Sequence, residues 1–307
     1  MSSVLADVST ILVAIVLESI PFVLLGSLLS GIASQFLDED RIRRLLPRSP
    51  WLAIPASALL GVVVPVCDCG VFPLARRLST KGLPASCTAA LLCAAPLLNP
   101  TVALSTAWAF PHNPLILWGR MIAGFAAAIL AGVAVHVAGG KEPPSRKGVE
   151  EPHVHGPECS HEGHEHTTIG TNSKFLRAAT ATATDFANTM SVVVVGATAA
   201  AFLQTALPRQ FLDHLAGSPI LSCLSLMALA FFASICSNAD AFVARSMMGI
   251  FPTGALLSFL IFGAMIDLKN LLLLLGSFRI RFVALVVASA AIIAFGAGLW
   301  VNLRVAP

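Results

Sequence analysis

Two cysteines flank an acidic residue in the segment PVCDCGVFP, and their spacing suggests a site for a soft ligand. Cys67 and Cys69 would point to nearly opposite sides of a regular helix, but they would converge if this stretch were unwound. Thiolates are the ligands that soft cations and trivalent metalloids favour. Asp68 lies between the thiols, and Gly70 and Pro73 follow. We predict a helix break that forms part of a binding site; the alternative is a proline-kinked helix with packed cysteines.

A second polar segment interrupts a later apolar stretch. It contains Cys236, Ser237, Asn238 and Asp240. If it is also unwound, it would face the first segment and complete a central site. The alternative is a helix whose Ser and Asn side chains bond back to their own backbone. Asp240 is a candidate proton carrier in the first interpretation, and a structural partner of Arg245 in the second.

A third interruption is expected in the segment APLLNPT. Pro96 and Pro100 each lack a backbone donor, and Asn99 offers two donors and an acceptor at the same depth. Its counterpart later in the chain is Asp267. Two interpretations are possible: these residues have a functional role, or Asp267 and Lys269 form a purely structural ion pair.

Residues 139–174 form a polar, Pro/Gly-rich tract that resembles none of the apolar stretches around it. Its imidazoles and thiol would bind zinc or another divalent metal, although their spacing does not match a zinc finger. We predict a flexible, loosely chelating loop and no other cofactor; the alternative is a tolerant polar linker. The candidate metal ligands are His153, His155, Cys159, His161, His164 and His166.

The composition requires lipid as the solvent for much of the chain. Of the 307 residues, 56% are hydrophobic and only 11% are charged, whereas soluble domains carry about 25% charged residues. No nucleic-acid-binding motif or phosphate-binding glycine loop occurs. Apolar stretches of about 20 residues are long enough to span a bilayer. They predict helices over 8–36, 51–78, 83–110, 114–138, 180–207, 217–245, 251–275 and 281–303.

The two halves of the chain resemble repeats. The segment around Cys67 aligns with that around Cys236, and Asn99 then aligns with Asp267. Glu18 and Gly26 have rough counterparts in Asp185 and Gly196. We predict an all-α integral membrane protein with about eight transmembrane helices in two repeated four-helix halves, with broken helices near the midplane. The predicted units are 1–138, 139–174 and 175–307.

The basic residues favour, by a small margin, a cytoplasmic N-terminus in a multi-pass protein of the cell inner membrane. Arg76, Arg77 and Lys81 then face the cytoplasm. Glu18 and Asp185 are either proton-binding groups or residues at the membrane interface.

The segments PVCDCGVFPLARRL, KGLPAS and APLLNPTVALST resemble the signature of the ArsP-like predicted permease family. That bacterial family includes efflux permeases for trivalent organoarsenicals. The resemblance covers the chain except 139–174. Asp68 occupies a position at which some members have a neutral polar residue. This difference bears on the expectation of arsenical transport. The resemblance implies a permeation site at Cys67, Cys69, Gly70, Pro73, Pro96, Asn99 and Pro100, with Cys236, Ser237 and Asn238 in the second half.

The expected function is that of a membrane permease and not of an enzyme. The expected cargo is a soft metal(loid) or an organometalloid, such as a trivalent organoarsenical, moved outward across the lipid bilayer. A zinc or divalent-metal permease that uses the His-rich loop is the alternative within this class. Other classes are a membrane thiol oxidoreductase and a non-transporting metal sensor. A second copy of the chain or an accessory protein is the macromolecular partner considered.

Overall fold

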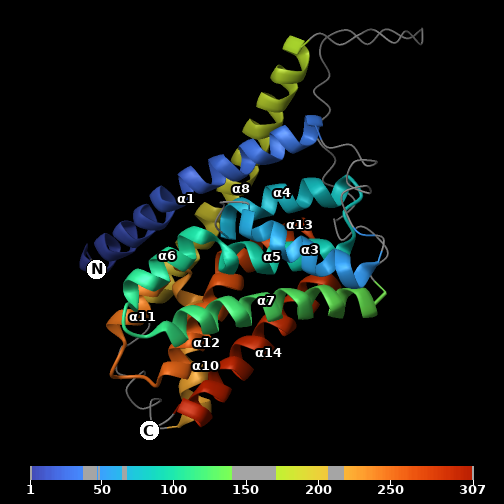
Figure 1. The fold of residues 1–307 in the computed structure, drawn as a ribbon. Helices are drawn as coiled ribbons and strands as arrows, with labels where there is room; N and C mark the ends of the chain where they lie inside the picture. The colour runs from blue at the N-terminus through green and yellow to red at the C-terminus, as the bar shows by residue number, and fades with distance from the viewer. Residues whose placement is uncertain are drawn as a thin grey trace, which may run out of the picture.

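The computed structural model describes residues 2–36, 47, 49–63, 68–139, 171–206 and 218–305. Within these residues the chain is almost entirely helical and contains no strand; the one β-bridge joins Met248 to Phe251. Figure 1 shows the arrangement of the helices. Their bounds are α1 (Ser2–Phe36), α3 (Pro50–Val63), α4 (Asp68–Thr80), α5 (Ala85–Leu98), α6 (Pro100–Ala109), α7 (Pro114–Val137), α8 (Thr171–Ala206), α10 (Pro219–Ala233), α11 (Asp240–Ser246), α12 (Thr253–Met265), α13 (Leu268–Ser277) and α14 (Ile280–Val305).

Six stretches in the described residues are long and apolar enough to cross a membrane. They are Val8–Ala33, Ala85–Ala109, Pro114–Val137, Ala178–Phe202, Thr253–Ser277 and Ile280–Arg304. Two further apolar helices, Pro50–Val62 and Pro219–Ala233, are shorter than the length of about 20 residues that a full crossing requires. The chain is therefore a multi-pass helical membrane protein by length and composition, and the count of eight spans stays a prediction.

Two of the predicted helices are interrupted at a polar residue that caps the helix after the break. The stretch predicted as 83–110 breaks at Asn99, whose side chain caps α6 by accepting a hydrogen bond from the Thr101 amide at 3.0 Å. Pro100 follows at the first position of α6, where its missing donor costs nothing. The stretch predicted as 251–275 breaks at Ile266 and Asp267, and Asp267 caps α13.

The expectation that Pro73 and Pro96 lie in broken backbone is wrong. Pro73 is inside α4 and Pro96 is inside α5. Each proline removes one donor from its helix without ending it, so a helix can continue where the surrounding packing holds it. The residues immediately before α4, Cys67 among them, lie outside the described residues.

The segment between α10 and α11 is not helical. Ser234 ends α10 with φ +47°, a left-handed conformation unusual for a residue with a side chain. The carbonyl of Cys236 accepts hydrogen bonds from the amides of Ala239 and Asp240, at 2.9 and 3.0 Å. The prediction of an unwound segment at 236–240 is therefore confirmed up to Asp240, where α11 begins.

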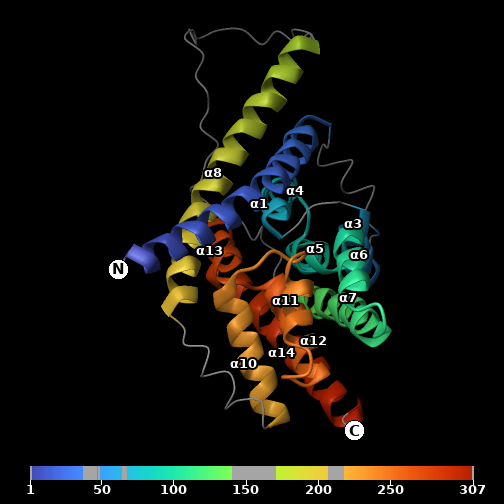
Figure 2. The same cartoon turned by 90° about the vertical axis from the view of Figure 1, so that its left-hand side faces the viewer.

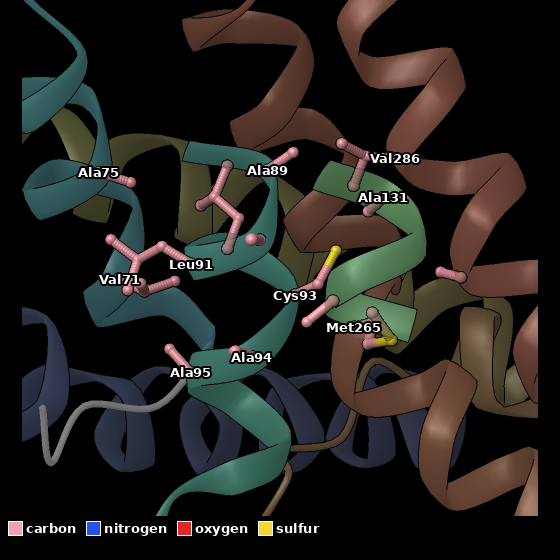
Figure 3. Packing of buried hydrophobic residues seen from close by; sticks show 14 of the residues in the cluster. Val71, Ala75, Ala89, Leu91, Cys93, Ala94, Ala95, Ala131, Met265 and Val286 are labelled. Carbon is pink, nitrogen blue, oxygen red and sulfur yellow. The ribbon is translucent and has the colours of Figure 1, made fainter. Parts of the chain in front are cut away.

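Helix α5 lies at the centre of the bundle. Of an 18-residue apolar stretch within the span Ala85–Ala109, to which α5 belongs, 78% is buried. Figure 3 shows its side chains between α4 on one side and α7 on the other, with Met265 and Val286 beyond. In Figures 1 and 2, α1 crosses α8 at one side of the bundle, and the first part of α8 projects past the other helices. Small side chains, many of them alanine, allow this close helix packing.

Two glycines allow α1 and α8, which cross each other, to pack closely against α4 and α13, the helices that begin after the breaks. A Cβ at Gly26 of α1 would overlap the carbonyl oxygen of Gly70 in α4. A Cβ at Gly196 of α8 would lie 2.8 Å from the Cβ of Lys269 in α13. These positions therefore fix α1 and α8 against the first turns of α4 and α13.

Gly26→Ala should destabilise the protein by about 1–3 kcal/mol, because the new methyl group meets backbone that cannot move aside independently. Thermal unfolding in detergent would measure this loss. Gly296→Ala is the matched control, since a Cβ there has no neighbour within 4 Å. Equal stability of the two variants would show that the contact between Gly26 and Gly70 is not close-packed.

Candidate permeation site

A buried charge cluster joins the first turn of α4 to the first turn of α13. We define it as Asp68, Ser234, Asp267, Lys269 and Asn270. The Nζ of Lys269 lies 3.2 Å from Oδ2 of Asp68 and 2.9 Å from Oδ2 of Asp267, in the second case without hydrogen-bond geometry. Each of the five residues is 2% exposed or less. Charges so deep in a membrane protein are costly, which makes them candidates for function.

The helix breaks position each member of the cluster. Asp267 accepts a hydrogen bond from the amide of Asn270 at 2.6 Å, as an N-cap residue does. The carboxamide of Asn270 then donates to Oδ2 of Asp68 at 3.1 Å. Ser234 accepts from the amide of Leu268 through Oγ and from Lys269 through its carbonyl, at 3.2 and 3.1 Å. The end of α10 and the starts of α4 and α13 are thereby joined.

A second polar group, the arginine cluster, consists of Thr106, Arg120, Ser237 and Asp240. Arg120 of α7 is fully buried and donates from Nη2 to both carboxylate oxygens of Asp240, at 3.1 and 2.9 Å. The same nitrogen donates to the carbonyl of Ser237 at 3.0 Å, and Nη1 donates to Oγ1 of Thr106 at 2.9 Å. The charged guanidinium thus connects α6, α7 and α11.

The segment 234–239 connects the two clusters, because Ser234 belongs to one and Ser237 to the other. Cys236 lies between them in the sequence and interacts electrostatically with Lys269. Cys69 also interacts electrostatically with Lys269. Thiols from both halves of the chain therefore lie within electrostatic range of one ammonium group.

Several buried polar atoms have no protein partner, although both clusters are densely bonded. Those that belong to the clusters or adjoin them are Oδ1 of Asp68, Oδ2 of Asp267, Oγ of Ser237, Oδ1 of Asn238, Oδ1 of Asn270 and Nε of Arg120, which lack a hydrogen-bond partner; Oγ of Ser27 and Oγ of Ser79 lie elsewhere. An unpaired buried polar atom costs roughly 1–3 kcal/mol, so such atoms call for a ligand, a water or a functional reason. Their concentration beside the helix breaks favours a polar binding site there.

The structure brings some of the sequence-predicted site residues together and separates others. Asp68, Cys69 and Cys236 lie around Lys269, and Ser237 and Asp240 bind Arg120. The alternative partner of Asp240, Arg245, instead donates to the sulfur of Met248. Asn99 bonds locally to Thr101, and Pro96 lies in the adjoining turn of α5. Cys67 and the candidate metal ligands of the loop lie outside the described residues.

Sequence reasoning missed Arg120, Thr106, Ser234 and Asn270 as members of the site. Arg120 had a usable signal, since it is the one Asp, Glu, Lys or Arg from 82 to 140. It lies in the second turn of α7 and is fully buried. The residue type of Ser234 does not predict its left-handed backbone conformation.

Among the described residues, no group of three or more His, Cys, Asp and Glu side chains is arranged to hold a metal ion. The two clusters are instead ion-paired networks. A further ion pair lies nearer the surface, where Arg77 donates from Nε to Oδ2 of Asp185 at 3.0 Å and Ser30 donates to the same oxygen at 2.7 Å. It joins α4 and α8 through α1.

Long apolar helices, interrupted helices and buried charge networks together define a polytopic helical membrane protein. The chain belongs to the family described as "Predicted permease" (ArsP_1), which matches residues 4–303. The family predicted from the three sequence segments is thus confirmed.

Two curated relatives span almost the whole chain. It is 35% identical over 297 residues to the "UPF0718 protein YcgR" of Bacillus subtilis, which covers 96% of this chain and 97% of that protein. It is 29% identical over 289 residues to a Streptococcus mutans protein named "Putative two-component membrane permease complex subunit", covering 92% and 91%. No solved structure matches the chain.

Proposed function

We propose that this protein moves a small solute across the cell inner membrane through the region between the two clusters. The observation that carries the proposal is the buried charge cluster, in which Asp68 from one half of the chain meets Lys269 from the other. Transporters place their binding sites where interrupted helices of two halves meet. Family membership supports the same class of activity.

The proposed cargo is a soft metal(loid) or organometalloid, such as a trivalent organoarsenical, moved outward. Cys69 and Cys236, which both interact electrostatically with Lys269, support this choice because thiols favour soft ligands. Cys67 precedes Asp68 in the sequence and would add a third thiol. The Streptococcus mutans relative is named as a complex subunit, so an accessory membrane protein is a further proposed partner.

The double variant Cys67→Ser/Cys69→Ser should lose export of the soft solute, since serine hydroxyls are hard and weak ligands for it. Cells would be exposed to zinc, copper, nickel, arsenite and a trivalent methylarsenical. Elemental mass spectrometry would then measure their content. We expect wild-type cells to retain several-fold less of one element than cells with the double variant.

Cys159→Ser is the matched control, because it removes a thiol from the predicted loop and leaves the membrane segments unchanged. Equal amounts of each variant in the membrane must be verified. If wild-type and empty-vector cells contain the same amount of all five elements, soft-solute export is refuted for this panel. If the control loses export as well, the loop thiol is part of the pathway.

A divalent-metal permease is the second candidate, favoured by five histidines and a cysteine between residues 150 and 167. Deleting 150–167 separates the two candidates. Loss of zinc or nickel export with the deletion would favour the metal permease. Unchanged export of a metalloid would favour the first candidate.

We also propose two repeated halves of four helices with a cytoplasmic N-terminus. Each half would begin with a long helix, α1 or α8, and end with an uninterrupted one, α7 or α14. Between these, the pair α5/α6 corresponds to α12/α13, and α3/α4 corresponds to α10/α11. Labelling single cysteines at residues 47 and 139 from either side of the membrane would test this topology.

A further inference from the structure

The two short apolar helices, α3 and α10, cannot cross a bilayer by themselves. The 14 residues of α3 and the 15 of α10 extend about 20 Å, whereas the hydrocarbon core is about 30 Å thick. Each is followed by another short helix, α4 or α11. The directions of these helices show whether each pair crosses the membrane or returns to the face where it began.

Helix α3 runs in the same direction as α5. Their early residues Ile54 and Ser86 both lie against Gly132 of α7, where an added Cβ would be 2.6 Å from the side chain of Ile54 and 2.9 Å from the carbonyl oxygen of Ser86. Near the other end of α3, an added Cβ at Gly61 would be 2.8 Å from the amide nitrogen of Ala95 in α5. The starts of α3 and α5 therefore lie at the same face, together with the end of α7.

Helix α4 runs against α5. Only residues 81–84 connect the two helices. In Figure 3, α4 rises from Val71 to Ala75. Helix α5 descends from Ala89 to Ala95 in the same view. The end of α4 therefore lies where α5 begins, so the pair α3/α4 begins and ends at one face of the membrane.

The pair α10/α11 has the same arrangement in the second half. The side chain of Asn302, near the end of α14, accepts from the amide of Gly254 at 2.8 Å and donates to the carbonyl of Pro219 at 3.4 Å. Helices α10 and α12 therefore begin side by side. An added Cβ at Gly263 of α12 would be 3.0 Å from the Cβ of Ala230 in α10, so their later residues also lie together. The turn after α11 leads back to the start of α12.

Helices α1 and α8 cross the membrane in opposite directions. The Nζ of Lys81, just after α4, donates to the carbonyl of Ala33 near the end of α1 at 3.3 Å, so α1 ends where α4 ends. An added Cβ at Gly31 would be 2.8 Å from the carbonyl oxygen of Ala178, so the span of α8 begins at this face as well. We call it the loop face, because residues 140–170 connect α7 to α8.

Helices α10 and α12 begin at the opposite face, which we call the terminal face. Helix α7 runs from this face to the loop face. An added Cβ at Gly119, near the start of α7, would be 3.1 Å from the side chain of Leu257 in α12. Helix α14 ends at the same face, because Asn302 bonds to Gly254 at the start of α12. The two short-helix pairs therefore enter from opposite faces.

The inner ends of the two pairs meet at Lys269. Asp68 is the first residue of α4, and Ser234 is the residue that ends α10. The Nζ of Lys269 lies 3.2 Å from Oδ2 of Asp68 and 3.1 Å from the carbonyl of Ser234. Lys269 itself follows the break within the span Thr253–Ser277. Both pairs thus end inside the membrane at one buried group of the charge cluster.

An ion pair holds α4 against the second half on the loop side of this point. Arg77 donates to Asp185 of α8 from Nε at 3.0 Å and from Nη2 at 3.3 Å. Arg77 lies nine residues after Asp68 in α4, which is about 14 Å along a helix. The two paired side chains are 14% and 12% exposed, so they lie nearer to water than the charge cluster. The pair therefore stands between the cluster and the loop face.

We propose that α3/α4 and α10/α11 are re-entrant hairpins that enter from opposite faces, and that α4 is the gate of the permeation pathway at the loop face. Each half then keeps four helical elements, of which three cross the membrane, and the halves are inverted repeats. Transporters built from inverted repeats bind their solute near the midplane, where the repeats meet. The gate rests on the proposed permease function, whereas the topology does not depend on it.

Cysteine labelling tests the topology without any solute. Pro47→Cys, Ala138→Cys and Ile250→Cys place single thiols at exposed positions, in a Cys159→Ser parent whose own labelling is subtracted. A membrane-impermeant maleimide would be added to intact cells and to inside-out vesicles. We expect positions 47 and 138 to react from one face and position 250 from the other. Eight crossings would put 47 and 138 on opposite faces, and that result overturns the proposal.

Arg77→Gln tests the gate, because it removes the guanidinium that pairs with Asp185. Cys69 and Cys236 are buried and interact electrostatically with Lys269, so their modification reports access to the charge cluster. A membrane-impermeant methanethiosulfonate would be added from each face, and peptide mass spectrometry would identify the modified thiol. We expect modification from the loop face to accelerate about tenfold, because the fraction of open molecules rises.

Arg76→Gln is the matched control, since it removes the preceding arginine and leaves the pair with Asp185 in place. Both variants must elute as wild type does on size exclusion. A rate in Arg77→Gln equal to that of the control, or an equal rise from both faces, overturns the gate. Failure of the permease function is seen separately, as absence of flux for every solute in the panel, because neither labelling measurement requires a solute.

Discussion

Lys269→Met should cause the largest loss of folded protein of any single substitution in the membrane helices. The change leaves Asp68 and Asp267 in the interior without their shared cation. Removing one member of a buried ion pair costs about 3–5 kcal/mol, because the remaining charge cannot be hydrated. Here two carboxylates are affected. Fluorescence-detected size exclusion and thermal unfolding in detergent would measure the folded fraction.

The triple variant Asp68→Asn/Asp267→Asn/Lys269→Met separates charge from shape. It removes all three charges, so it should recover most of the folded protein. Arg281→Met is the control, since Arg281 is an exposed cation at the start of α14. If Lys269→Met is as stable as the control, the cluster is hydrated in the folded protein and its burial has no energetic consequence.

Arg120→Leu should have the second largest effect, because Arg120 holds three helical segments together. Its loss would leave the carboxylate of Asp240, the carbonyl of Ser237 and the hydroxyl of Thr106 without their donor. We expect a loss of about 3–5 kcal/mol in the free energy of unfolding. Thermal unfolding should show it, and limited proteolysis should cut faster between α10 and α11.

A double-mutant cycle with Asp240→Asn isolates the ion pair. If most of the cost is an unpaired carboxylate, Arg120→Leu/Asp240→Asn should be more stable than Arg120→Leu alone. Arg304→Leu, which removes an exposed cation near the end of α14, should stay close to wild type. Strictly additive effects of the two substitutions would contradict a direct energetic link between Arg120 and Asp240.

Much of the architecture could be predicted from the sequence because lipid is a demanding solvent. Unpaired backbone groups cannot face lipid, so long apolar stretches must be helices and polar interruptions must be buried in protein. This reasoning located the breaks near Asn99 and Cys236, but not the one at Asp267, which lies inside the helix predicted over 251–275. Asn99 and Asp267, aligned by repeat matching, both became the caps of the helices that follow them.

Proline was a poor guide to where helices end. Pro73 and Pro96 are inside helices, whereas the break before α13 contains no proline. A proline weakens a helix by one hydrogen bond, and neighbouring helices can offset that loss. The position of this break is set instead by a polar side chain, that of Asp267, which accepts a hydrogen bond from a free backbone amide at the start of α13.

The sequence alone determined the membrane class, the family signature and the presence of ionisable residues within apolar stretches. Only the tertiary structure decided which of them meet. Asn270 reaches Asp68 across 202 positions, and Arg120 reaches Asp240 across 120. Helices that are apolar on all sides carry little periodic signal for their neighbours. Pairing is set instead by the close packing of small residues and by the need of each buried charge for a partner.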